Sequence, residues 1–151
     1  MIIHTLVLLM KQTQTPANNS TSQKFILLGE DDIDDQEILE EIFSSIDSSF
    51  RIQFINNGKK VVSHLEEIQD EHLPCLIVLD YNMPELNGAE ILKNLDINLR
   101  IKKVPKIIWS TSNAPAYKNM CLELGACDYL VKPSKINMLE DMVKHMLSYC
   151  D

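Results

Sequence analysis

The segment Leu76–Asp80 constrains the fold more strongly than any other stretch of the chain. It contains four consecutive aliphatic residues and ends on an acid. A run of large aliphatic side chains without polar alternation is typical of a strand covered on both faces, as in a parallel α/β sheet. Pro84 cannot continue a strand ladder, and Gly88 favours a tight turn into a helix. The pattern predicts that Asp80 lies at the carboxyl end of a central strand, where open α/β sheets bind their ligands.

Short apolar runs alternate with helix-period segments from Lys24 onward. Five runs have the composition of strands: 25–28, 52–55, 76–80, 106–110 and 129–131. Each is followed by apolar residues at the spacing of an amphipathic helix. Five such units predict an α/β fold in which a doubly wound parallel sheet has helices on both faces and right-handed crossovers.

Polar side chains follow four of the predicted strands. Glu30 and Asp31 follow the first strand, Asp80 ends the third, Ser110 ends the fourth and Lys132 follows the fifth. These strand ends share one edge of a parallel sheet, so the side chains are expected to converge. Carboxylates brought together repel one another unless a cation is present, and their oxygen atoms suit a hard divalent ion such as Mg²⁺. With a hydroxyl and a lysine beside them, the arrangement predicts phosphoryl transfer onto Asp80.

Five sequence pieces, in this order, resemble the signature of two-component response regulator receiver domains, as found in chemotaxis-type and phytochrome-associated small regulators. The pieces are Glu30-Asp31, Asp80-x-Asn82-Met83-Pro84-x-x-x-Gly88, Ser110, Tyr129 and Lys132-Pro133. The resemblance implies a flavodoxin-like (βα)5 sheet with strand order 2-1-3-4-5. We expect residues 24–151 to form the receiver domain and residues 1–23 to form a flexible tail.

The resemblance also implies a role for each matching residue. Asp80 would accept a phosphoryl group from a phosphohistidine. The Mg²⁺ ligands would be Asp31 and Asp80 directly, Glu30 mainly through a water, and the backbone carbonyl of Asn82. Ser110 would bind a phosphoryl oxygen, and Lys132 would pair with Asp80, then with the phosphate, across a cis bond to Pro133. Ser110 and Tyr129 would form the switch that responds to phosphorylation.

The expected function is that of a stand-alone regulator, because no sequence remains after the fifth helix for an output domain. Its partners would be a sensor histidine kinase or phosphotransfer protein, docking near the acidic first helix, and an unidentified downstream protein. Output would be a phosphorylation-dependent contact or a phosphorelay step, and homodimer formation stays open. Such a protein catalyses only its own phosphorylation and dephosphorylation, so it is not expected to be an enzyme in the usual sense.

Two other functions compete with this one. A phosphatase with an aspartate nucleophile would use Asp80 in a similar way. Phosphatases of that kind place a second acid two residues after the nucleophile, where this chain has Asn82, which cannot act as an acid or base. A scaffold that works without phosphorylation would leave the intact set of site residues unexplained.

Composition limits the partners and the compartment. The net charge is −8, which disfavours nucleic-acid binding because contacts to phosphates require Lys and Arg. The apolar run over residues 1–10 is half of the roughly 20 residues that a membrane helix needs, so no membrane association is expected. The four cysteines contain no Cys-x-x-Cys pair. They predict a reducing, cytoplasmic setting without a disulfide, in which Cys75 and Cys127 are small buried thiols.

Three local features depart from the receiver pattern or add to it. Gly29 occupies a position where the family commonly has a β-branched residue. Trp109 is bulky for the strand position before Ser110. The connection over residues 96–105 is long and basic, and we expect it to be a solvated loop.

Overall fold

The computed structural model describes residues 23–150, and the predicted tail, apart from Gln23, lies outside them. Five parallel strands form one sheet in the order β2-β1-β3-β4-β5. The strands are β1 (Phe25–Gly29), β2 (Arg51–Ile55), β3 (Leu76–Asp80), β4 (Lys106–Ser110) and β5 (Asp128–Val131). This is the predicted flavodoxin-like α/β fold with strand order 2-1-3-4-5.

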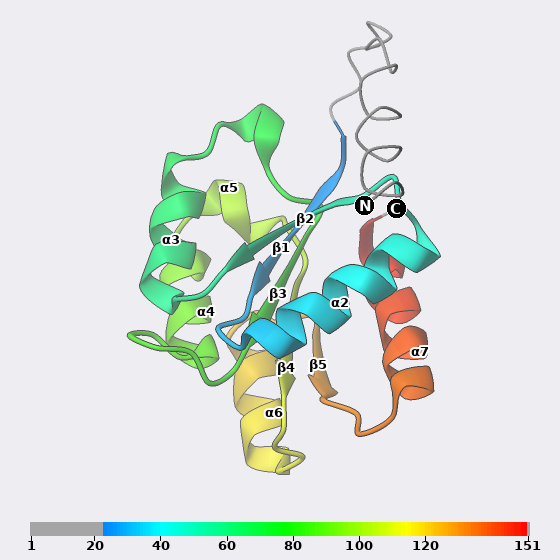
Figure 1. The fold of residues 1–151 in the computed structure, drawn as a ribbon. Coiled ribbons are helices and arrows are strands. Elements are labelled where there is room, and N and C mark those ends of the chain that lie inside the picture. Colours follow the sequence, from blue (N-terminus) through cyan, green and yellow to red (C-terminus); the bar gives the residue numbers. More distant parts are fainter. Residues whose placement is uncertain (1–22, 151) are drawn as a thin grey trace, which may run out of the picture.

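Helices cover both faces of the sheet (Figure 1). The α-helices are α2 (Ile33–Ile46), α3 (Gly58–Glu67), α4 (Gly88–Asp96), α5 (Leu99–Lys102), α6 (Pro115–Glu123) and α7 (Ile136–Leu147). Two short 3₁₀ turns, η1 (Asp70–His72) and η2 (Ser148–Cys150), complete the described elements. No helix within residues 23–150 is long and apolar enough to cross a membrane.

The sheet separates two apolar cores, and alternate residues of each central strand supply them. Ile77 and Leu79 of β3 pack with α3, α4 and α6, whereas Leu76 and Val78 pack with α2 and α7. All four side chains are fully buried. Successive side chains of a strand point to opposite faces, so a strand buried on both faces must be apolar throughout. This is why the continuous aliphatic run identified the central strand.

The connection over residues 96–105 is not the solvated loop that was expected. It contains α5, and its Ile101 is completely buried. The amine of Lys106, itself only 5% exposed, donates hydrogen bonds of 2.8 Å to the carbonyls of Ile101 and Val104. One apolar residue at the right position is enough to fix a basic segment against the core. Lys106 supplies hydrogen-bond donors for one carbonyl within α5 and one just after it.

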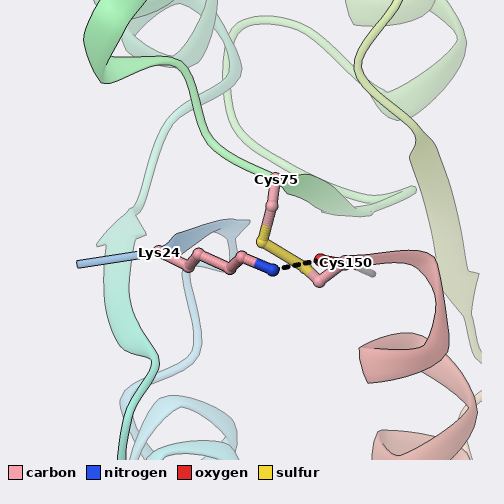
Figure 2. Close-up of a disulfide and its surroundings, with 3 residues drawn as sticks. All are labelled: Lys24, Cys75 and Cys150. Carbon is pink, nitrogen blue, oxygen red and sulfur yellow. Dashed lines mark hydrogen bonds between the residues drawn. A yellow bond between two sulfur atoms is a disulfide. The ribbon is translucent and has the colours of Figure 1, made fainter. Parts of the chain in front are cut away.

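The prediction that the chain lacks a disulfide is wrong. Cys75 and Cys150 form a disulfide with a Cα–Cα distance of 5.0 Å (Figure 2). The two residues are 75 positions apart, so no spacing motif reveals the pair. They meet because η2, which directly follows α7, lies beside the residues that lead into β3. Cys127 is exposed rather than buried, while Cys121 is buried.

Candidate functional site

Three carboxylates meet where β1 and β3 end side by side. Gly29 pairs with Leu79 in the parallel ladder, which places the next residues, Glu30 and Asp80, next to each other. Glu30 is fully buried, Asp80 is 5% exposed, and Asp31 is exposed. One carboxylate oxygen from each of the three lies within 4.8 Å of the others. The predicted convergence of the strand ends is therefore present in the fold.

Glu30 is held in place by the start of α2. The backbone N–H of Asp32 donates to Glu30 Oε1 at 3.1 Å, and the Gln36 side-chain amide donates to the Glu30 carbonyl at 2.6 Å. Asp32 also caps α2 by accepting from the N–H of Asp35. Burial raises the pKa of Glu30 to about 7, and the nearby charge of Asp80 adds to that rise. Ionisation of all three carboxyl groups at once is therefore unfavourable in the absence of a cation.

Lys132 brings a positive charge to these carboxylates. Its backbone N–H donates to the Ser110 carbonyl at 2.8 Å, continuing the pairing of β4 with β5. Its Nζ donates to Asp80 Oδ2 at 2.8 Å and to Glu30 Oε2 at 3.2 Å. Burial alone would lower the pKa of Lys132, but the hydrogen bond and charge of Asp80 outweigh it and raise that pKa. The amine is thus held in its charged form beside Asp80.

Two further contacts to Lys132 were not anticipated. Asp35 Oδ2 accepts from Nζ at 3.4 Å. The Trp109 ring lies under the amine, with Nζ 4.5 Å from the ring centroid. The bulk of Trp109 was the available signal, because an aromatic face can stabilise a cation. The expected cis bond between Lys132 and Pro133 is wrong, since no peptide bond in the described residues is cis.

The loop after β3 positions the Asp80 side chain through a backbone hydrogen bond. The Asn82 N–H donates to Asp80 Oδ1 at 3.1 Å, and the Gly88 N–H closes the turn onto the Tyr81 carbonyl at 2.8 Å. Asn87 then starts α4 with a capping box shared with Glu90. Asp80 thus accepts one hydrogen bond from its own loop and one from Lys132.

Ser110 and Tyr129 lie on the β4–β5 side of this edge. Ser110 is 1% exposed, and its Oγ accepts from the Ser112 N–H at 3.1 Å. The Tyr129 ring is 5% exposed, and its hydroxyl donates to the Ser112 carbonyl at 2.8 Å. Both predicted switch residues therefore bind the same short loop, so a movement of that loop would be felt by both.

The donor set suits a hard divalent ion. Glu30, Asp31 and Asp80 offer only oxygen, and magnesium is usually held through one or two carboxylates together with waters and phosphate. A buried carboxyl with a pKa near 7 beside a second carboxylate is the kind of group that a cation would stabilise in its charged form. The residues present therefore fit Mg²⁺, and Lys132 adds a donor for a phosphoryl oxygen.

Residues 26–144 match the family model described as the response regulator receiver domain. The chain belongs to this family. Its relatives include the two-component response regulator ORR11 of Oryza sativa subsp. japonica, 37% identical over 103 residues, which make up 67% of this chain and 68% of that protein. The two-component response regulator ARR8 of Arabidopsis thaliana is 29% identical over 143 residues, covering 84% of this chain and 63% of that protein.

Solved structures agree with the receiver fold. The phosphorylated cyanobacterial phytochrome response regulator RcpA superposes with a TM-score of 0.76 at 23% identity, over 85% of this chain and 94% of that chain. The Mn²⁺-bound form of response regulator Rcp1 gives a TM-score of 0.73 at 26% identity, over 83% and 92%. Receiver domains are phosphorylated on an aspartate by histidine kinases, so this receiver is a signalling domain rather than a conventional enzyme.

Proposed function

We propose that Asp80 is the phosphoacceptor of this receiver. The observation that carries the proposal is the 2.8 Å hydrogen bond from Lys132 Nζ to Asp80 Oδ2, at the point where the carboxylates of Glu30 and Asp31 also converge. An Asp80 oxygen attacks the phosphorus of a phosphohistidine, the P–N bond breaks, and its electron pair stays on the ring nitrogen, so that the histidine takes up a proton and leaves as the imidazole. The product is an acyl phosphate on Asp80, whose new charge Lys132 is placed to bind.

The residues that would hold Mg²⁺ are Asp31 and Asp80 directly, Glu30 mainly through a water, and the backbone carbonyl of Asn82. When bound, the ion would supply charge neutralisation for the transferring phosphoryl group. Support comes from the oxygen cluster within 4.8 Å and from the Mn²⁺-bound form of Rcp1, a 26% identical receiver. Asn82 donates its N–H to Asp80, which places its backbone beside the cluster.

Ser110 and Tyr129 act as the switch in this proposal. The phosphoryl group attracts the Ser110 hydroxyl, which now accepts from the Ser112 N–H. Movement of that loop would change the hydrogen bond that the Tyr129 hydroxyl donates to the Ser112 carbonyl. The surface of α6, β5 and α7 would then change its preferred partner. We propose that output is such a protein contact or a phosphorelay step, in the cytoplasm, with residues 24–151 as the receiver and residues 1–23 as its tail.

The phosphodonor is a sensor histidine kinase or a phosphotransfer protein, and the site offers it a hollow with both apolar and charged walls. This hollow, of about 150 Å³, lies beside Lys132 and is lined by Ile38 of α2, Trp109 and Ile136 of α7 among others. The side chains of Ile33 and Ile136 are 68% and 66% exposed. A partner that delivers phosphohistidine to Asp80 would cover these side chains, which supports docking against α2 and the start of α7.

The deciding experiment is the intact mass after incubation with acetyl phosphate, with and without Mg²⁺. The protein is expected to gain one phosphate in the presence of Mg²⁺, and Asp80→Asn is expected to gain none. Asp141→Asn, an exposed acid on α7, is the matched control and should behave like the parent chain. An adduct that survives in Asp80→Asn, or no adduct with any donor, would refute the assignment and favour the scaffold.

A further inference from the structure

The disulfide lies at the opposite edge of the sheet from Asp80. Cys75 immediately precedes β3, whose far end carries Asp80, and Cys150 is the last described residue of η2. The two sulfur atoms differ in their surroundings. Cys150 is 4% exposed and packs in the core between the sheet, α2 and α7, whereas Cys75 is half-buried. An attacking group from solvent therefore meets Cys75 first.

A surface cleft of about 560 Å³ leads to Cys75. Its lining includes Lys24, Arg51, His72, Glu71 and Cys75. Arg51 lies over the ring of Phe25, 5.0 Å from its centroid, which fixes its charge at the cleft wall. Lys24 and Arg51 outnumber Glu71, so the cleft favours an anion although the whole chain carries a net charge of −8. Its volume is in the range of small-molecule sites.

We propose that Cys75 is a site of reversible S-thiolation by a small anionic thiol of the glutathione class. The thiol is drawn into the cleft by Lys24 and Arg51 and attacks Cys75 Sγ in line with the disulfide. Cys75 lines the cleft, whereas Cys150 does not, so Cys75 is the residue that would carry the mixed disulfide. Cys150 is the leaving group because the core shields it from attack.

The exchange balances without any other reactant. The thiolate forms an S–S bond to Cys75 Sγ, the Cys75–Cys150 bond breaks, and its electron pair leaves with Cys150 Sγ, which then takes a proton. A second thiol can attack the sulfur that the small molecule contributed to the mixed disulfide. This attack releases Cys75 as a thiol and the small molecule as its disulfide. Two thiols are oxidised and one protein disulfide is reduced. The reverse sequence, with the oxidised small molecule, closes the bond again.

Lys24 favours this direction of attack. Its Nζ donates to the Cys150 carbonyl at 3.1 Å, and Figure 2 shows the amine reaching across to the residue that leaves. A neighbouring ammonium stabilises a thiolate, so a lysine bound to the backbone of Cys150 favours release of that residue's sulfur. The same hydrogen bond retains the end of η2 after the covalent link has opened. Thiolation therefore loosens the carboxyl end of α7 without detaching it.

The test is mass spectrometry of the protein in glutathione buffers, with alkylation and peptide mapping. Cys127→Ser serves as the parent, because Cys127 is an exposed thiol that would react on its own account. Oxidising buffer is expected to give the Cys75–Cys150 disulfide, and intermediate buffer a glutathione adduct mapped to Cys75. An adduct mapped to Cys150, or free alkylation of both residues in oxidising buffer, would overturn the proposal.

The charge of the cleft is tested by the rate of disulfide opening at low ionic strength. Arg51→Ala is expected to slow opening by glutathione about twofold, the effect of one unit charge about 10 Å away in water, and to leave opening by uncharged 2-mercaptoethanol unchanged. Lys118→Ala, an exposed lysine on α6, is the control and should slow neither. Equal slowing of both thiols by Arg51→Ala, or no slowing of glutathione, would contradict recognition of an anionic thiol.

Discussion

At the scale of single residues, Lys132 compensates for the charges of the carboxylates around it. Its side chain is 15% exposed, while those of Glu30 and Asp80 are 0% and 8% exposed. Lys132→Met leaves two buried carboxyl groups facing each other, so we expect the unfolding free energy without divalent ions to fall by about 3 kcal/mol. Urea unfolding with and without Mg²⁺ measures this, and Mg²⁺ should recover part of the loss.

Lys135→Met is the control for that measurement, because Lys135 is exposed near the same strand end and forms no ion pair within the described residues. It should change stability little, with or without the ion. If Lys132→Met were no more destabilising than Lys135→Met, the amine would not be neutralising the cluster.

Gly29 makes room for Met83 of the loop after Asp80. A Cβ at residue 29 would lie 2.8 Å from Met83 Cε and 3.1 Å from Leu79 Cδ2, which explains why a β-branched residue is missing here. Gly29→Val is expected to lower the unfolding free energy by about 2 kcal/mol through overpacking. Combining it with Met83→Ala should cost less than the sum of the single changes, with a coupling of about 1 kcal/mol in a denaturation cycle. Strict additivity would show that the two side chains do not compete for space.

At the scale of elements, the start of α3 presses on the loop that holds Asp80. Asn57 caps α3, and the Gly58 N–H donates to the Pro84 carbonyl at 3.1 Å. A Cβ on Gly58 would collide with the backbone carbonyl of Leu86. Because backbone cannot swing aside as the end of Met83 can, Gly58→Ala should cost about 2 kcal/mol in thermal or urea unfolding. Lys59→Ala, one position further along α3, should cost little, and equal effects would remove the collision as the cause.

The far end of α7 is attached to β5 by a polar cluster. His145 Nε2 lies 2.7 Å from Asp128 Oδ2, and the Tyr149 hydroxyl donates to the same oxygen at 3.1 Å. Burial opposes ionisation of Asp128, but the hydrogen bond from His145, with those from the Tyr129 N–H and Tyr149, outweighs burial and holds the pKa of Asp128 below its usual value of 3.8. This cluster therefore contributes stability above pH 3.8 and loses it as the pH falls through the lower folded pKa.

His145→Ala should accordingly lower the unfolding free energy by about 0.5 kcal/mol near neutral pH, a typical value for an exposed pair. The pH-dependent part of this difference should disappear once the pH is below the folded pKa of Asp128. Unfolding curves across the acid range measure it, with Lys144→Ala as the neighbouring control on α7. A difference that stayed constant through the acid range would assign the effect to lost packing against Tyr149 instead.

At the scale of the whole molecule, the disulfide joins the carboxyl end of the described chain to the start of the central strand. It closes a loop of 75 residues, and a loop of that length is expected to stabilise the fold by about 4 kcal/mol through the unfolded state. Adding a dithiol should lower the unfolding free energy of the protein by about that amount. Cys75→Ser already lacks the link, so it should not respond to the dithiol. A similar fall in both proteins would refute the contribution of the disulfide.

Local sequence predicted the elements and the family because its signals are short-range. The aliphatic run of β3 predicted burial on both faces. The polar residues after the strands indicated the edge of the sheet where the candidate site lies. Asp35 and Trp109 were not assigned to the site, because their contacts with Lys132 cross from other elements. The burial of Ile101 was not predicted for the same reason, since a basic segment carries no local signal that one of its side chains enters the core.

The sequence by itself determined the order of the five strands and of the five helices that follow them, the family, and the set of residues at the carboxyl edge. Periodicity and strand-end chemistry are properties of neighbouring residues. Tertiary structure decided the rest. It paired Cys75 with Cys150, set Gly29 against Met83 and Gly58 against Leu86, and kept the Lys132–Pro133 bond trans. These outcomes depend on how elements distant in the chain approach one another, and packing in three dimensions sets those distances.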